Sequence, residues 1–171
     1  MSELVDLVNS DGEIIERGVL RDDAMKYGEL YMQIVVVVIR NSAGDLLVHQ
    51  RAKTKKVNPG DIDHVCGGIL SGETPEIAAI REALEEVGVA PKNLEIVRQG
   101  VNSYGRYCHL LRADSDELPS SELDSSEVAW AKYLTIEELI TRRDDGTLTF
   151  VDGFFDDMHA TSVPNDGATQ Q

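Results

Sequence analysis

Six consecutive apolar residues, Ile34 to Ile39, constrain the fold of this chain more than any other segment. All six side chains in IVVVVI are β-branched, which favours a strand, and they leave no polar face. A strand over residues 31–40 must therefore be covered on both sides, and we expect it at the centre of a sheet. The run is far too short to cross a membrane.

Shorter patterns predict the other elements. Turn signals at 9–12 and 41–44 separate segments typical of strands, which predicts hairpins. Strands mixed with a few helices predict an α/β fold in layers around a central mixed β-sheet. The expected strands are 4–8, 13–15, 31–40, 45–49, 62–65, 94–98, 104–112 and 128–134, and the expected helices are 75–87, 135–143 and a piece within 150–159.

The length of 171 residues fits one domain with one sizeable core. No internal repeat and no long linker divides the chain. We expect a single domain over residues 1–160, followed by a flexible C-terminal tail over 161–171.

The net charge of −15, from 31 acidic and 16 basic residues, limits the partners of this chain. Such a surface repels a phosphate backbone, so we expect no nucleic-acid partner. The absence of a long apolar run likewise predicts no membrane partner.

Two cysteines, Cys66 and Cys108, indicate the compartment. They form no CxxC pair and are too few for a disulfide scaffold, so we expect reduced thiols and a cytoplasmic protein. The first residues are acidic and lack a basic n-region, so no signal peptide is expected.

The segment 75–87 is the clearest helix. Thr74 suits the N-cap, Pro75 the first turn and Gly88 the stop. An apolar stripe is expected to face the core. It consists of Ile77, Ile80, Leu84 and Val87, with Ala83 at its edge.

Glu82, Glu85 and Glu86 are expected together on another side of this helix. Three close carboxylates repel one another, and a hard divalent cation would offset this more than Arg81 does. From the helix pattern alone, a magnesium site and a solvated acidic face remain equal alternatives.

The wider segment GGILSGETPEIAAIREALEEVGV resembles the signature of the Nudix hydrolase family. The spacing agrees at every fixed position, and only Ala83 is smaller than the usual aliphatic residue. The resemblance implies a Nudix-like α/β/α sandwich and hydrolysis of a diphosphate linkage in a small molecule, a nucleoside diphosphate derivative above all. The seven fixed positions are Gly67, Glu73, Arg81, Glu82, Glu85, Glu86 and Gly88.

The resemblance also implies roles for these residues. Glu82, Glu85 and Glu86 would hold Mg²⁺, with Mn²⁺ as a substitute, and one of them would activate water; the sequence does not say which. Glu73 and Arg81 would pair to brace the loop. Gly67 would let the backbone approach the metal and phosphates closely. The carbonyl of Cys66 is a further expected ligand, and Glu127 is the candidate for an additional acidic ligand, with Glu122 behind it.

A second resemblance joins the stretch LLVHQRAKTKKVNPGDIDHVCGG to the isopentenyl diphosphate isomerase branch and its hydrolase-like relatives. In isomerases a cysteine at the place of Cys66 takes part in proton transfer. The histidines of the isomerase site would fall at Tyr31 and Gly68, and its acid would fall near Arg106, so these are not matched. A hydrolase with Cys66 as a small buried residue is therefore favoured over an isomerase.

The basic loop holds Arg51, Lys53, Lys55 and Lys56 in six residues. It is interpreted as a phosphate clamp, with Arg51 and Lys55 as the substrate-binding candidates, against the alternative of a solvated loop. A non-catalytic nucleotide-binding Nudix module is a further alternative, which the intact glutamate set disfavours. A homodimer is expected from the family alone.

Overall fold

The computed structural model describes residues 3–162 of the chain. Its elements form a mixed sheet with helices on both sides. In chain order they are β1 (Leu4–Val8), β2 (Ile14–Leu20), η1 (Arg21–Tyr27), β3 (Tyr31–Arg40), β4 (Leu46–Arg51), β5 (Ile62–Asp63), β6 (Val65–Gly68), α1 (Pro75–Val87), β7 (Lys92–Val101), β8 (Tyr107–Asp114), β9 (Val128–Leu134), α2 (Ile136–Asp144) and α3 (Phe154–Ala160).

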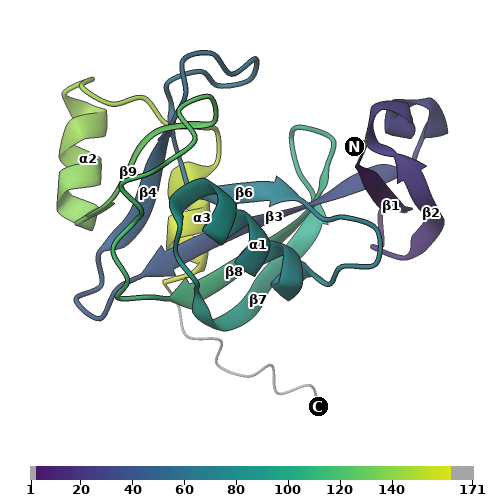
Figure 1. The fold of residues 1–171 in the computed structure, drawn as a ribbon, viewed down its shortest axis with the longest axis horizontal. Coiled ribbons are helices and arrows are strands. Elements are labelled where there is room, and N and C mark those ends of the chain that lie inside the picture. Colours follow the sequence, from purple (N-terminus) through teal and green to yellow (C-terminus); the bar gives the residue numbers. More distant parts are fainter. Residues whose placement is uncertain (1–2, 163–171) are drawn as a thin grey trace.

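Strand β3 lies at the centre, as its composition predicts (Figure 1). Its residues 34–37 pair with β6 in antiparallel orientation, and residues 33–40 pair with β8 in parallel orientation. Its two ends add β1 and β4, so four strands contact it. The valines of β3 are buried on both faces, which explains why the run has no polar side.

The two faces of β3 belong to two separate cores. Val35, Val37 and Ile39 pack beneath α1. Val36 and Val38 face the opposite way, in a cluster to which α2 and α3 contribute Leu139, Phe154 and Met158. Helix α1 and helix α3 thus cover opposite sides of the sheet, and the predicted α/β/α sandwich with a central mixed sheet is confirmed.

The predicted core stripe of α1 is confirmed at Val87, and at Ala83 on its edge, but is wrong at its other three residues. Ile77 is 53% exposed and Leu84 49%, and Ile80 is also exposed. The buried side of the helix consists of Ala78, Ala79, Ala83 and Val87. Small alanine side chains let α1 lie close to the sheet, and this orientation directs Glu82 and Glu86 toward β6 instead of toward solvent.

Several boundaries differ from the predicted ones. The expected strand over 104–112 begins only at Tyr107, because Asn102 accepts hydrogen bonds from the amides of Tyr104 and Arg106 in a turn. In place of the predicted strand over 62–65, the structure has two short strands, over 62–63 and 65–68. The predicted strand 13–15 continues to Leu20, and η1 after it was not predicted.

The first residues of the predicted tail are held by Arg40, which donates to the Thr161 hydroxyl at 3.1 Å and to Ser162 at 2.8 Å. Residues 163–171 lie outside the described residues, so the domain limits stay a prediction. Among the residues described, none of the helices has the length and apolar character that a membrane span requires.

Candidate active site

A cavity of about 1240 Å³ opens beside the inner face of α1. Its floor is the sheet, at Ile34, Val36 and Cys66. Its walls come from α1, the basic loop, the β7–β8 hairpin and the start of α3. Polar side chains from distant parts of the sequence therefore line one cavity.

Helix α1 has the ends that its sequence predicts. The Thr74 hydroxyl accepts a hydrogen bond from the amide of Ile77 at 3.3 Å, and Pro75 occupies the first turn. Gly88 adopts a left-handed conformation at φ 70°, and its amide donates to the Leu84 carbonyl. These caps fix where the helix begins and ends, and hence where its glutamates lie.

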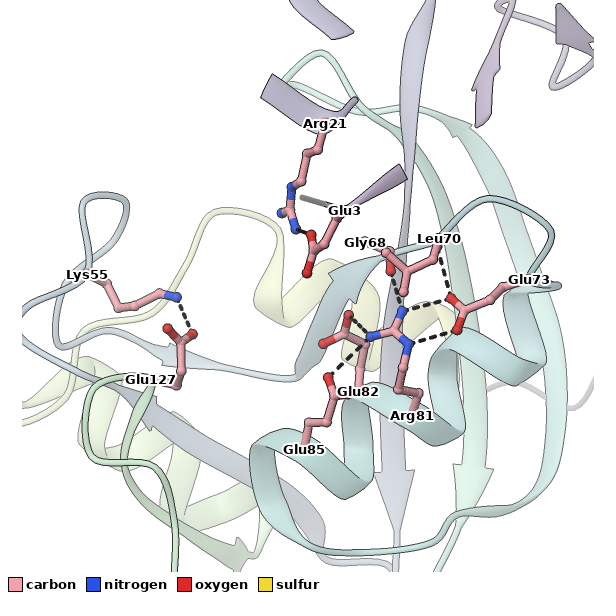
Figure 2. Close-up of polar contacts among 10 residues, drawn as sticks. All are labelled: Glu3, Arg21, Lys55, Gly68, Leu70, Glu73, Arg81, Glu82, Glu85 and Glu127. Atoms are coloured by element: carbon pink, nitrogen blue, oxygen red, sulfur yellow. Dashed lines mark hydrogen bonds and ion pairs between the residues drawn. The ribbon is translucent and has the colours of Figure 1, made fainter. Parts of the chain in front are cut away.

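Arg81 organises the loop before α1 (Figure 2). Its Nε and Nη2 atoms donate to the two carboxylate oxygens of Glu73, both at 2.8 Å, and Nη2 also donates to the Gly68 carbonyl at 2.7 Å. Glu73 in turn accepts from the amide of Leu70 at 2.9 Å. The expected pair of Glu73 and Arg81 is therefore brought together, and hydrogen bonds with Glu73 raise the pKa of Arg81 above its ordinary value.

The same guanidinium contacts the glutamate set. Nη1 donates to Glu82 at 2.7 Å and to Glu85 at 3.3 Å. Glu82 is largely buried, whereas Glu85 is exposed. The three glutamates are thus not equivalent: Glu82 and Glu86 turn toward the sheet, and Glu85 stays at the rim.

Gly67 makes this arrangement possible. A Cβ atom at this position would lie 1.9 Å from the carboxyl carbon of Glu82, so only glycine leaves room for that carboxylate. Glu86 accepts a hydrogen bond from the Cys66 amide at 3.1 Å. The two glutamates are packed against the backbone of β6 by these contacts.

Burial makes these carboxylates costly in their charged form. It raises the pKa of Glu82, although the hydrogen bond from Arg81 opposes the rise, and it raises the pKa of Glu86 well above its ordinary value. A divalent cation would offset that cost with the oxygen ligands it prefers. Within residues 3–162, no three acidic, His or Cys side chains are gathered around one point; Glu82 and Glu85 are bound by Arg81, and Glu86 by the Cys66 amide. The donor set and its burial nevertheless suit a hard cation.

Cys66 lines the cavity, and burial raises the pKa of its thiol, so that the sulfur stays protonated. Cys66 is partly buried against the core cluster of Val36 and Val38, and its interpretation as a packed residue without a chemical role stays a prediction. The expected role of its carbonyl as a ligand stays a prediction, as does the resemblance to the isomerase branch.

Two of the four basic-loop residues line the cavity, Arg51 and Lys55. Arg51 donates to Asp63 at 3.1 Å, and Lys55 forms an ion pair with Glu127. Glu127 also lines the cavity, but its carboxylate lies opposite the α1 glutamates and binds Lys55 (Figure 2). Glu122 is exposed and does not line the cavity.

Sequence reasoning missed several residues of the cavity wall. Arg21 and Glu3 form an ion pair at one side, and Arg98 and Asp157 form another. No short motif contains either pair, because 18 residues separate the first two and 59 the others.

Comparison with known proteins agrees with this picture. The NUDIX domain family matches residues 30–153. An uncharacterised Nudix hydrolase of Listeria monocytogenes is 31% identical over 92% of this chain and 96% of its own. The crystal structure of DR0079 from Deinococcus radiodurans has a TM-score of 0.71 at 26% identity, over 92% of this chain and 99% of that one. The Nudix domain of Shewanella oneidensis NrtR, crystallised with ADP ribose, has a TM-score of 0.60 at 13% identity, over 84% of this chain and 97% of that one.

The segment 67–73, here called the glycine loop, leads from the end of β6 to α1. A sandwich that presents glutamates from a helix behind such a loop defines a Nudix-type domain. The chain belongs to the Nudix family, and it is a Nudix hydrolase.

Proposed function

We propose that this enzyme hydrolyses the diphosphate linkage of a nucleoside diphosphate derivative with the help of Mg²⁺, or of Mn²⁺ as a substitute. One observation carries the proposal: at the edge of the cavity Glu82 is packed against Gly67 and Glu86 against the Cys66 amide, with burial disfavouring their charge. Carboxylates in that setting suit a hard divalent cation.

Glu82, Glu85 and Glu86 would hold the metal, which neutralises phosphate oxygens and acidifies water when bound. Hydrolysis adds one water across the P–O–P bridge. The water oxygen forms the new bond to phosphorus, the bridging oxygen leaves with the other phosphate, and one glutamate accepts the proton. The pair of Arg81 and Glu73 would hold the loop against the helix during this reaction.

The cavity supports a small-molecule substrate with groups on both sides of the diphosphate. Its volume of about 1240 Å³ exceeds what a diphosphate alone would fill. The Nudix domain of NrtR, which shares the fold, was crystallised with ADP ribose, in which a diphosphate joins adenosine to a ribose. Arg51 and Lys55 lie on the basic side of the cavity and would bind phosphate oxygens, and Gly67 would let them approach the backbone.

The test is product release from a panel of nucleoside diphosphates, nucleotide sugars, dinucleotides and isopentenyl diphosphate, with and without Mg²⁺. We expect metal-dependent turnover of at least one nucleotide. Glu86→Gln should lower kcat by about 10²-fold or more, since it removes a charge that binds metal or accepts the proton.

Glu76→Gln is the matched control, because Glu76 lies on the same helix but outside the cavity. It should leave turnover unchanged. Full activity of Glu86→Gln, or turnover without a divalent cation, would contradict the proposal. Isomerisation of isopentenyl diphosphate would assign the site to the isomerase chemistry of Cys66.

A further inference from the structure

Arg21 reaches the active site from a part of the chain that the family match does not cover. It is the first residue of η1, whereas the match begins at residue 30. Its side chain lines the cavity. Three atoms of its guanidinium lie 3.7–3.9 Å from the position that a Cβ of Gly68 would occupy, so the group lies directly over the backbone of the glycine loop.

The backbone around Arg21 is fixed to that loop. The Arg21 amide donates to the Glu3 carbonyl at 3.0 Å, and the amide of Ser71 donates to the Leu4 carbonyl at 2.8 Å. The buried carboxylate of Asp6 accepts from the Ser71 hydroxyl at 2.6 Å. Strand β1 therefore joins η1 to the loop that carries Glu73, and the root of the Arg21 side chain is held in place.

The side chain itself is held only weakly. Among residues 3–162, its ion-pair partner is Glu3, and both side chains of this pair are about half exposed, at 50% and 48%. Such exposed pairs contribute little to stability, about 0–1 kcal/mol. A phosphate group offers more charge and a geometry that a guanidinium binds through two hydrogen bonds, so it can replace Glu3.

The position of Arg21 also fits the charge of the site. Arg21 and Glu82 line the same cavity, where the guanidinium lies at Gly68 and the carboxylate at the neighbouring Gly67. In Figure 2, Arg21 and Glu3 lie on a different side of Gly68 and Glu82 from Lys55 and Glu127. Cationic groups thus flank the glutamates on two sides, as an extended anion requires.

We propose that Arg21 binds a phosphate group of the substrate above Gly68, and that Glu3 is its partner while the site is free. This proposal rests on the proposed function, since it takes the substrate to be a diphosphate. The proposal makes η1 part of the binding site, together with the N-terminal hairpin of β1 and β2 that precedes it.

The test is calorimetric binding of methylenediphosphonate, whose P–C–P bridge cannot be hydrolysed, as its Mg²⁺ complex. The probe carries no nucleoside, so the result does not depend on the leaving group. Arg21→Ala should weaken binding about 10-fold or more, the loss typical for a hydrogen bond with a charged partner. Arg21→Lys should recover part of the affinity, because it keeps the charge but loses the fork.

Lys26→Ala is the matched control. Lys26 lies on the same η1 segment, pairs with Asp23 at 2.6 Å and does not line the cavity. Its removal should change affinity less than twofold. Equal affinities of the wild type and Arg21→Ala would overturn the proposal while leaving the proposed function intact.

Glu3→Gln tests the same contact from the other side and serves even where Arg21→Ala unfolds. It should bind the probe up to about 5-fold more tightly, because the competing carboxylate is gone. Weaker or unchanged binding in this variant would count against Glu3 as the resting partner. A wild type that neither binds the probe nor hydrolyses any diphosphate would overturn both proposals.

Discussion

Arg81 and the cations at the rim of the cavity are held in different ways. Arg81 donates to Glu73, Glu82, Glu85 and the Gly68 carbonyl, and the first two of these carboxylates are largely buried. Arg21 and Lys55 each have a carboxylate partner that is about half exposed. Arg81 therefore shapes the site, whereas the proposed role of the rim cations is to exchange a carboxylate for a phosphate.

The energies differ accordingly. A hydrogen bond with a charged, partly buried partner contributes about 1.5–3 kcal/mol, against about 0–1 kcal/mol for an exposed ion pair. Substitutions on the Arg81 side should change both stability and activity. Substitutions at the rim should change substrate binding and leave stability nearly unaltered.

Gly67→Ala should have the largest effect on activity. The new Cβ would displace the carboxylate of Glu82, which is the flexible end of a side chain, so the fold should lose little stability. A misplacement of about 1 Å at a catalytic group can cost about 10²-fold in rate, and we expect a loss of that size. Steady-state kinetics measures the loss of rate, and thermal unfolding measures the change in stability.

Gly68→Ala is the control for this substitution. The three atoms nearest to its Cβ all belong to Arg21, the first at an ordinary contact distance of 3.7 Å. We expect less than about a threefold change in kcat but a rise in KM, because the new Cβ would lie beneath the guanidinium that we propose to bind phosphate. Similar losses in both variants would mean that the space beside Glu82 is not what the reaction needs.

Arg81→Lys should lower both stability and activity. It keeps the charge but cannot bind both oxygens of Glu73 and the Gly68 carbonyl together. The free energy of unfolding should fall by about 2 kcal/mol, as for the loss of one such charged hydrogen bond. Urea unfolding measures this, and kcat/KM should fall about 10-fold or more because the α1 glutamates lose their brace.

An unchanged free energy of unfolding in Arg81→Lys would mean that Arg81 stabilises the fold no more than the cations at the rim do. Arg142→Lys is a suitable reference, since Arg142 lies in the last turn of α2, away from the cavity.

Asp6 connects the N-terminal hairpin to the glycine loop, and its contribution to the free energy of unfolding should depend on pH. Burial raises the pKa of Asp6, but hydrogen bonds from Ser71, Gly18 and Gly72 and the charge of Arg17 outweigh it, so the pKa lies below the ordinary 3.8. A carboxyl group with a lowered pKa stabilises the fold above its unfolded value, and this contribution disappears as the pH falls through the folded value.

Asp6→Asn should therefore lower the free energy of unfolding by about 1–2 kcal/mol at pH 7, with a difference from the wild type that shrinks below pH 4. Urea unfolding between pH 7 and pH 3 follows this difference directly. A difference that stays constant or grows toward low pH would contradict the assigned sign.

Local patterns predicted the parts of the molecule that depend on neighbours in the sequence. Caps at Thr74 and Gly88 gave both ends of α1, and the β-branched run gave the limits of β3. The signature spacing named Glu73 and Arg81, which the structure brings together. These features require only contacts within a few residues.

The errors arose where distant segments decide. A stripe of large apolar residues on α1 predicted the buried side, yet Ile77 and Leu84 are exposed, because the loop at Gly67 accommodates Glu82 only when the alanine side faces the sheet. Arg21 was missed for a similar reason: its place over Gly68 depends on β1 pairing with both β2 and β3. No pattern within either segment contains that information.

Lys55→Ala should have the smallest effect on stability, and it tests the rim side of the comparison. Its partner Glu127 is about half exposed, so the free energy of unfolding should change by less than about 1 kcal/mol. If Lys55 binds substrate phosphate, KM should rise about three- to tenfold with little change in kcat, because a contact made equally before and during the reaction affects only binding. Lys53→Ala is the control, since Lys53 lies in the same loop but does not line the cavity.

Glu127→Gln separates the two roles open to the Glu127 carboxylate. A partner of Lys55 alone should leave the Mg²⁺ requirement unchanged, whereas a metal ligand should raise the Mg²⁺ concentration needed for half-maximal activity by about 10-fold or more.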